Sequence, residues 1–372
     1  MKTAEIHLEV DVNHGNSSNA GKTDLRSQVG RNRPPAQVNN RPISQINRPP
    51  ENDGIFACCG PRPTREVDLS GAPDEDFFSD NIVKLTNGFT AYRLIEPLKP
   101  GQPDPPLIVL IHGLQNSSFM WADVAELLAD FDQGPLANVL IYDIFGHGRS
   151  PWTGKNLSLD VLVTQVKELL ESLGYSDKQI SLVGYDLGGA VAAGFAARFP
   201  NLALSLTMIS PVGILFNGPF DEVSFKSKYF GELSIYKQRS QLPLKQFDEF
   251  YNIDDHSSHY YLISKQVAMA TWQLEHTPGY LGSLLSLYRY FPLREMEEIY
   301  YAIGRSLKNV LIIWGGRDKV TPYGKCIKFM EKAFPNATIV DIVDAGHNCV
   351  YEKFEEVVTE VLQFHRDIYY TK

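Results

Sequence analysis

The sequence predicts an α/β fold in which a mainly parallel sheet is flanked by helices and carries an inserted helical cap. Short apolar runs rich in Val, Ile and Leu alternate with longer segments whose apolar residues have helical spacing, and one long aromatic stretch interrupts this alternation. Strands that alternate with helices are joined by right-handed crossovers and form a sheet covered on both faces. Because ligands bind at the carboxyl ends of such strands, we expect the functional site there.

The N-terminal residues 1–66 are predicted to be a disordered tail. They are rich in Asn, Pro, Arg, Ser and Gly, and such a composition buries too little apolar surface to offset the entropy of ordering. Within the tail, Cys58 and Cys59 are adjacent and are followed by Arg62 and Arg65. The two cysteines could be S-acylated and attach the chain peripherally to a membrane. An ordinary pair of reduced thiols is the alternative.

The first part of the folded core is predicted at residues 77–211. Thr86-Asn87-Gly88 lies between two apolar segments, and Asn-Gly in that position indicates a β-hairpin. Further short apolar runs predict strands, and the segments with apolar residues three and four apart predict helices. The expected strands are 82–85, 89–94, 107–111, 139–142, 180–183 and 204–209, and the expected helices are about 121–128, 159–173 and 190–199.

The alternation stops at residues 212–306, which are predicted to form a helical cap over the site. This stretch is rich in Tyr and has few strand-like runs, and its aromatic side chains are expected to pack together, with a few lining an apolar pocket. The α/β pattern resumes at residues 307–372, which complete the core. Strands 310–314 and 338–343 and helices 323–333 and 354–369 are expected there.

Composition and charge exclude several classes of function. The formal net charge is −9, and an acidic folded part argues against binding to nucleic acid. No run approaches the roughly 18 apolar residues that suggest a transmembrane segment, and the acidic start of the chain does not resemble a secretory signal, so a cytoplasmic protein is predicted. His256 and His259 form a lone pair without Glu or Cys nearby, so neither a metal site nor a cofactor is expected.

The stretch from Gly184 to Gly189 marks the expected reactive position. It lies between the apolar run 180–183 and an Ala-rich helical segment, which is the context of a nucleophile elbow, a sharp turn from strand to helix that exposes one side chain. That side chain is commonly Ser, whereas here it is Asp186.

Two more polar residues, Asp318 and His347, follow later predicted strands. With Asp186 they give the chain order nucleophile, acid, histidine. On these residues the chain resembles the α/β-hydrolases with an inserted cap. The motifs that carry the resemblance are His112-Gly113, Gly146-His147-Gly148-Arg149-Ser150, Gly184-x-Asp186-x-Gly188-Gly189, Gly315-Gly316-Arg317-Asp318 and Gly346-His347.

The resemblance implies a role for each matching residue. Asp186 would be the nucleophile, His347 the general base, and Asp318 the group that orients the imidazole. The backbone N–H groups of Leu114 and Leu187 would form an oxyanion hole. His112 would support its loop rather than react.

A carboxylate nucleophile suits displacement at a carbon that bears a strained oxygen or a halide, giving an ester that activated water then cleaves. The chain therefore resembles epoxide hydrolases and haloalkane dehalogenases more than serine esterases, and a small apolar substrate is expected. Dehalogenases place Trp after the nucleophile, where this chain has Leu187, so an epoxide is expected before an organohalide. Epoxide opening would also need cap tyrosines to protonate the leaving oxygen. An ester hydrolase or lipase, and a non-catalytic binding or scaffolding protein, remain the alternatives.

Overall fold

The computed structural model describes most of the chain from residue 81 onward. The described residues are 71–72, 81–97, 105–131, 134–135, 137–218, 222–227, 229–251 and 260–370. The predicted tail, with Cys58 and Cys59, and the pair His256 and His259 lie outside the described residues.

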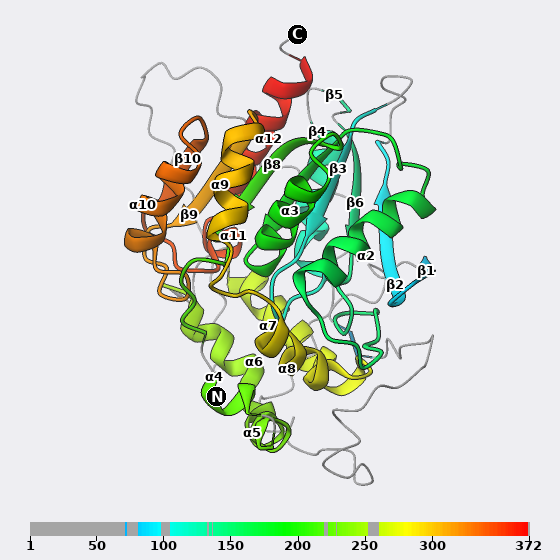
Figure 1. The fold of residues 1–372 in the computed structure, drawn as a ribbon, viewed down its shortest axis with the longest axis vertical. Coiled ribbons are helices and arrows are strands. Elements are labelled where there is room, and N and C mark those ends of the chain that lie inside the picture. Colours follow the sequence, from blue (N-terminus) through cyan, green and yellow to red (C-terminus); the bar gives the residue numbers. More distant parts are fainter. Residues whose placement is uncertain are drawn as a thin grey trace, which may run out of the picture. The chain divides into compact units, whose positions relative to one another are not determined.

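An eight-stranded sheet forms the centre of the fold, in the order β1-β2-β6-β3-β7-β8-β9-β10 (Figure 1). The hairpin β1–β2 is antiparallel and β2 pairs antiparallel with β6, whereas all later neighbours are parallel. The predicted α/β fold with a mainly parallel sheet is confirmed. The strands are β1 (Ile82–Leu85), β2 (Gly88–Ile95), β3 (Leu107–Ile111), β6 (Asn138–Tyr142), β7 (Ile180–Tyr185), β8 (Ala203–Ile209), β9 (Val310–Gly315) and β10 (Thr338–Ile342), with β4 (Asp130–Phe131) and β5 (Gly134–Pro135) as a separate pair.

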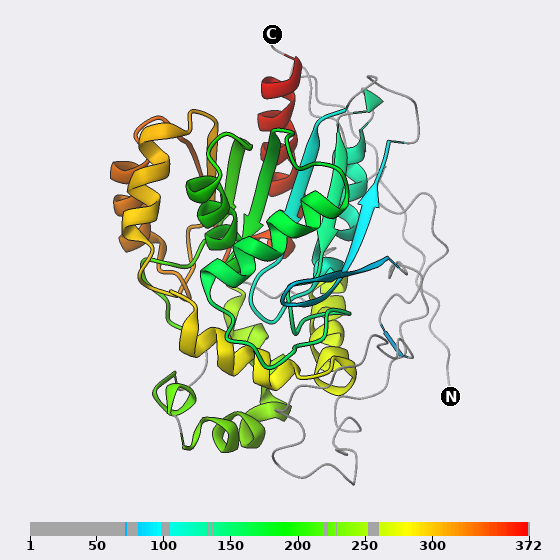
Figure 2. The same ribbon diagram turned by 45° about the vertical axis from the view of Figure 1, so that its right-hand side comes forward.

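Helices cover both faces of this sheet. In Figures 1 and 2, α2 and α3 lie on one face and α12 on the other. Every residue of the central strands β3, β6, β7 and β9 is buried, which explains why these strands read as continuous apolar runs. The helices of the core are α1 (Ala122–Ala129), α2 (Leu159–Ser172), α3 (Leu187–Arg198), α9 (Glu297–Ser306), α10 (Tyr323–Ala333), α11 (Cys349–Glu352) and α12 (Phe354–Tyr370), with a 3-10 turn η4 (Ser118–Trp121).

Helix α3 begins earlier than its sequence suggests. The Ala-rich run predicts a start at residue 190, whereas the helix starts at Leu187, directly after the elbow, although glycines have low helix propensity. Gly188 and Gly189 are both buried in its first turn. Close packing against neighbouring backbone offsets their low helix propensity. The helix therefore begins directly after Asp186, which is its N-cap residue.

The helices between β8 and α9 lie at the end of the sheet where the parallel strands stop (Figure 2). They contact the loops there: Gln273 accepts a hydrogen bond from the backbone N–H of Gly148 at 2.7 Å, and Ser283 donates one to the carbonyl of Gly146 at 3.0 Å. Helix α9, although inside the range predicted as cap, packs on α3 and α10. The remaining elements are α4 (Glu222–Lys226), α5 (Gly231–Gln238), η5 (Arg239–Gln241), α6 (Leu242–Lys245), η6 (Gln246–Glu249), α7 (Tyr260–His276) and α8 (Tyr280–Tyr290).

Within the described residues, no helix combines the length and the apolar character that a membrane crossing requires.

Candidate active site

Asp186 occupies the sharp turn between β7 and α3. Its backbone has φ 52° and ψ −117°, a conformation that costs an L-residue about 1–3 kcal/mol and that is found mostly at functional sites. The side chain is nonetheless almost buried, since the residue is only 3% exposed. The turn therefore holds a carboxylate out of bulk water in a fixed direction.

The glycines around Asp186 are required by close backbone contacts. A Cβ atom on Gly184 would lie 2.2 Å from the carbonyl oxygen of Gly188, and one on Gly188 would lie 2.1 Å from the carbonyl oxygen of Ile111. Both distances are far shorter than van der Waals contact. The spacing Gly-x-Asp-x-Gly thus follows from the packing of the elbow against itself and against the end of β3.

The loop after β3 contacts the Asp186 carboxylate directly. The backbone N–H of Leu114 donates a hydrogen bond to Oδ2 of Asp186 at 2.8 Å. A Cβ on Gly113 would lie 3.0 Å from the same oxygen, so glycine lets this loop approach. Leu187, the other predicted donor, is buried as the first residue of α3, and the described structure gives its backbone no bond to the carboxylate. One of the two expected N–H groups is therefore paired with Asp186.

His347, which follows β10, lies between two carboxylates. Its Nδ1 is 2.8 Å from Oδ2 of Asp318, and its Nε2 is 3.3 Å from Oδ1 of Asp186. Asp318 is fixed in turn by bonds from the backbone N–H groups of Val320, at 2.8 Å, and Thr321, at 2.9 Å. The structure thus brings together the three residues that the sequence placed at three separate strand ends.

The charges around His347 decide its protonation. Burial of the ring by itself lowers the pKa, but the negative charge of Asp318 and the hydrogen bonds and charge of Asp186 outweigh burial and hold the pKa of His347 well above its usual range. The imidazole therefore carries a proton while Asp186 is ionised. If Asp186 lost its charge, one of the supports for that proton would be removed.

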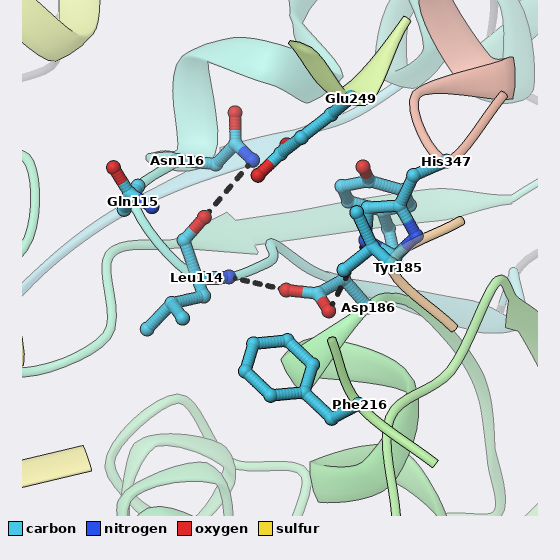
Figure 3. A pocket seen from close by; sticks show the side chains of 9 residues that line it. Leu114, Gln115, Asn116, Tyr185, Asp186, Phe216, Glu249 and His347 are labelled. Carbon is cyan, nitrogen blue, oxygen red and sulfur yellow. Dashed lines mark hydrogen bonds and ion pairs between the residues drawn. The ribbon is translucent and has the colours of Figure 1, made fainter. Parts of the chain in front are cut away.

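A small pocket opens beside Asp186 and His347 (Figure 3). The volume in which the centre of a water molecule fits is about 10 Å³, which is enough for about one water. The pocket is lined from the core by Leu114, Gln115, Asn116, Tyr185, Asp186, Val320 and His347, and from the segment between β8 and α9 by Phe216 and Glu249. A substrate larger than water would need some of these side chains to move.

Glu249 was missed by the sequence analysis. It ends the short turn η6, in a segment with no recognisable motif, and only its folding back onto the loop of His347 places it at the pocket. Burial raises the pKa of its carboxyl to about 7. A second missed residue, Asn348, donates a hydrogen bond from Nδ2 to Oε2 of Glu249 at 3.1 Å.

Cap tyrosines do not line the pocket in the part of the chain that the structure describes. Tyr280 points its hydroxyl at the carbonyl of Gln115, 3.5 Å away, and Tyr300 donates to the carbonyl of Val212. The tyrosine that does line it, Tyr185, belongs to β7 and donates to Oδ1 of Asn348 at 2.6 Å. Among the described residues that line the pocket, Glu249 is the carboxyl group besides Asp186, and it comes from the segment predicted as cap.

His112 has a supporting place, as the sequence suggested. Its Nδ1 donates to the carbonyl of Gly113 at 2.8 Å, and its Nε2 accepts from the backbone N–H of Ile144 at 2.9 Å. Burial, reinforced by the nearby His147, holds its pKa well below the usual range. Both ring nitrogens are thus occupied by backbone partners, which tie the loop after β3 to the loop after β6. No group of residues suited to a metal ion occurs among those described.

Comparison with known proteins gives the same fold. Residues 106–354 match the family model described as alpha/beta hydrolase fold. A dihydrolipoyllysine-residue acetyltransferase component of an acetoin cleaving system from Cupriavidus necator is 27% identical over 66% of this chain and 60% of its own length. Epoxide hydrolase 4 from Homo sapiens is 27% identical over 40% of this chain and 39% of its own length. The chain thus spans less than two thirds of these two relatives.

Two further similarities cover more of the other protein. A monoacylglycerol lipase from Homo sapiens, ABHD6, is 21% identical over 73% of this chain and 78% of its own length. Among solved structures, a thermophilic esterase from Thermogutta terrifontis superposes with a TM-score of 0.62 at 19% identity, covering 77% of this chain and 99% of the esterase. At that identity the structural likeness establishes the fold alone.

Proposed function

Because the chain belongs to the α/β-hydrolase fold family, we propose that it hydrolyses a small apolar epoxide through an ester on Asp186. The observation that carries this proposal is the orientation of the Asp186 carboxylate. Its Oδ2 accepts the N–H of Leu114 at 2.8 Å, while Oδ1 faces His347 at 3.3 Å, and Asp186 is one of the residues that line the pocket. Oδ2 is thus held by Leu114, and Oδ1, beside His347, is the oxygen that would attack.

In the first step, Oδ1 attacks a ring carbon of the epoxide, and the C–O bond of the ring breaks. Attack by a carboxylate is favourable here because ring opening releases strain, and because the carboxylate is already aligned and needs no reorganisation. The product is an ester that links Asp186 to the substrate, with the former ring oxygen as a hydroxyl.

In the second step, water attacks the carbonyl carbon of that ester. Esterification removes the charge of Asp186, which lowers the pKa of His347 and allows its neutral form to take a proton from water. The oxyanion that develops on Oδ2 already has the Leu114 N–H at hydrogen-bond distance, so the donor is in place before the charge appears. Asp318 keeps Nδ1 of His347 protonated, which leaves Nε2 as the base.

The relative named epoxide hydrolase 4 supports this substrate class. An organohalide is the weaker choice because Leu187 follows the nucleophile, where an N–H donor for halide would be needed. Ester hydrolysis is a second candidate, favoured by the relative named monoacylglycerol lipase. Against it stands the carboxylate itself, since its attack on an ester would give a mixed anhydride and expel a poor alkoxide leaving group.

A single-turnover experiment in heavy-oxygen water tests the mechanism. With excess enzyme and styrene oxide, the heavy oxygen should enter the Asp186 carboxylate, because water attacks the ester carbonyl, while the first diol formed carries none. Diol that acquires heavy oxygen in the first turnover, with Asp186 unlabelled, would contradict the ester mechanism.

The variant His347→Gln offers a trap for the same intermediate. Ester formation does not require His347 as a base but ester cleavage does, so a mass increase equal to one styrene oxide should accumulate on the peptide that carries Asp186. Turnover of a phenyl acetate ester that survives Asp186→Ala would instead favour the ester hydrolase. Binding of the epoxide without any turnover or adduct would favour a non-catalytic binding protein.

A further inference from the structure

We propose that Glu249 is the catalytic acid that protonates the leaving oxygen when Asp186 opens the epoxide. This inference rests on the proposed function and deepens it, because it names the proton donor that the ring-opening step requires. The donor comes from the segment between β8 and α9, as expected for this chemistry, but it is a carboxyl group and not a tyrosine hydroxyl.

The carboxyl group of Glu249 points into the pocket above Leu114 and Asp186 (Figure 3). His347 and Asp186 border the same small space. An epoxide admitted by movement of the lining side chains can place its ring carbon at Asp186 and its oxygen at Glu249, because both residues line this space. Ring opening needs a nucleophile and an acid at one site, and the pocket brings Asp186 and Glu249 together.

The backbone of Glu249 is fixed to the loop that carries His347. The backbone N–H of His347 donates to the carbonyl of Glu249 at 3.0 Å. A few residues on, the Glu352 carboxylate accepts from the N–H of Gly346 at 2.8 Å and from that of Tyr251 at 3.1 Å. A Cβ on Gly346 would lie 2.6 Å from the Glu249 carbonyl oxygen. The acid and the base of the proposed reaction are thus held together by one tight contact.

The side chain is oriented by a short chain of hydrogen bonds from the core. Tyr185 donates to Oδ1 of Asn348 at 2.6 Å, which turns Nδ2 of Asn348 toward Oε2 of Glu249, 3.1 Å away. Oε2 is thereby occupied as an acceptor. Among the described residues no partner contacts Oε1, which is therefore the oxygen that can hold the proton and give it to the substrate.

Burial and the nearby charges bring the pKa of Glu249 close to neutral pH. Burial raises its pKa, the positive charge of His347 lowers it, and the negative charges of Asp186 and Asp318 raise it, with a net value of about 7. Asn348 adds a hydrogen bond that favours the ionised form. An acid with a pKa near the working pH is well suited to proton transfer.

The protons balance over the cycle. In ring opening, Glu249 gives its proton to the former ring oxygen and becomes a carboxylate, while Asp186 becomes an ester. Glu249 then takes the proton of His347, which leaves His347 neutral. His347 accepts a proton from the attacking water and passes it to the departing alcohol oxygen. Asp186 is released as a carboxylic acid, and its proton returns to His347, so the net reaction adds one water to one epoxide.

Two substrates with the same phenyl group but different leaving groups test the role of Glu249. Styrene oxide needs a proton on its leaving oxygen, whereas bromide leaves 2-phenylethyl bromide as a stable anion. The rate of adduct formation on Asp186 is measured by mass spectrometry in full-length His347→Gln, with and without Glu249→Gln. Gln keeps an oxygen for Asn348. We expect Glu249→Gln to slow the epoxide reaction at least 100-fold, and the bromide reaction less than threefold.

The pH profile supplies a second measurement on the epoxide alone. Only protonated Glu249 donates. In the His347→Gln background, where the adduct is measured, the positive charge that lowers the pKa of Glu249 is absent, so this pKa lies above the value of about 7 that it has beside His347. The rate of adduct formation should be constant below this higher pKa and fall about tenfold per pH unit above it, and this fall should vanish in Glu249→Gln. Equal slowing of both substrates, or an unchanged pH profile, would show that Glu249 is structural and overturn the inference while the ester mechanism stands. If His347→Gln forms no adduct at all, the proposed function fails and the acid role fails with it.

Discussion

The two sides of the pocket are built in different ways. On the sheet side, Asp186, Asp318 and His347 stand at the ends of β7, β9 and β10. Asp186 is held by the loop after β3, Asp318 by the N–H groups of its own loop, and His347 by the Asp318 carboxylate. On the opposite side, Phe216 and Glu249 come from the irregular segments between β8 and α7. Their positions depend on contacts with the loops below them and not on a regular ladder of hydrogen bonds.

This difference suggests a division of labour. The sheet fixes the groups that must be aligned within a fraction of an ångström, since the parallel strands end at one edge. The opposite side supplies part of the pocket wall and the proposed proton donor, Glu249, which would set what substrate fits and how its leaving group departs. Changes on the sheet side should therefore abolish chemistry or folding. Changes on the opposite side should alter the rate, the substrate preference or the local stability.

Removal of the proposed nucleophile should have the largest effect. Asp186→Ala is expected to lower kcat/KM for styrene oxide by about 10⁴-fold or more, because no other group can form the ester. The matched control is Asp344→Asn, an exposed aspartate close to His347 in sequence, which should leave kcat/KM within about twofold. Substantial activity in Asp186→Ala would mean that the sheet side does not carry the chemistry.

The backbone contacts of the elbow predict a large loss of stability. Gly188→Ala places a Cβ 2.1 Å from the Ile111 carbonyl oxygen, and we expect it to lower the free energy of unfolding by about 3 kcal/mol. Gly324→Ala is the control, since no atom lies within 4 Å of its Cβ position and alanine favours a helix by up to about 1 kcal/mol. Urea unfolding measures the free energy of unfolding of both variants. Equal stability of the two variants would contradict the prediction.

The helices on the side opposite the sheet should lose local stability when Arg289 is replaced. Its guanidinium contacts Glu232 at 2.8 Å and the carbonyls of Phe225, at 3.1 Å, and Ser227, at 2.8 Å, and so joins α8 to α4 and α5. Arg289→Ala should cost about 1–2 kcal/mol. Hydrogen exchange should rise in α5 and not in β7.

The control for this prediction is an exposed ion pair of the core. Arg198 lies 3.0 Å from Asp160, with side chains 49% and 86% exposed, so Arg198→Ala should change stability by less than about 0.5 kcal/mol. Faster exchange throughout the sheet in Arg289→Ala would show that the two sides unfold together.

The smallest effect is expected at the apolar wall. Phe216 is buried at 2% exposure and lines the pocket. Phe216→Leu removes part of an aromatic surface, so KM for styrene oxide should rise about three- to tenfold, which corresponds to about 1 kcal/mol of lost apolar contact. kcat should change little, because the Phe216 side chain takes no part in the proposed proton transfers. A fall in kcat with unchanged KM would assign Phe216 a part in alignment instead.

The sequence alone determined the sheet and the side chains that stand at the ends of its strands. Apolar runs such as Ile108 to Ile111 are buried on both faces of the sheet and are therefore recognised as strands. The glycines of the elbow are required by contacts within the elbow and with the end of β3. The α/β-hydrolase fold that these motifs suggested is confirmed. The order of Asp186, Asp318 and His347 could be predicted because strand ends in a parallel sheet meet at one edge.

Only the tertiary structure decided which groups share the pocket. The pairing of Asp186 with Leu114 and not with Leu187 depends on the rotation of one side chain. The arrival of Glu249 beside His347 depends on contacts between segments that are about a hundred residues apart, as in the bond of Tyr251 to Glu352. Such contacts join segments that are far apart along the chain and that share no periodic pattern, so nothing in the local sequence encodes them. Strands are encoded by their apolar runs, and the elbow is recognised by the spacing of its glycines.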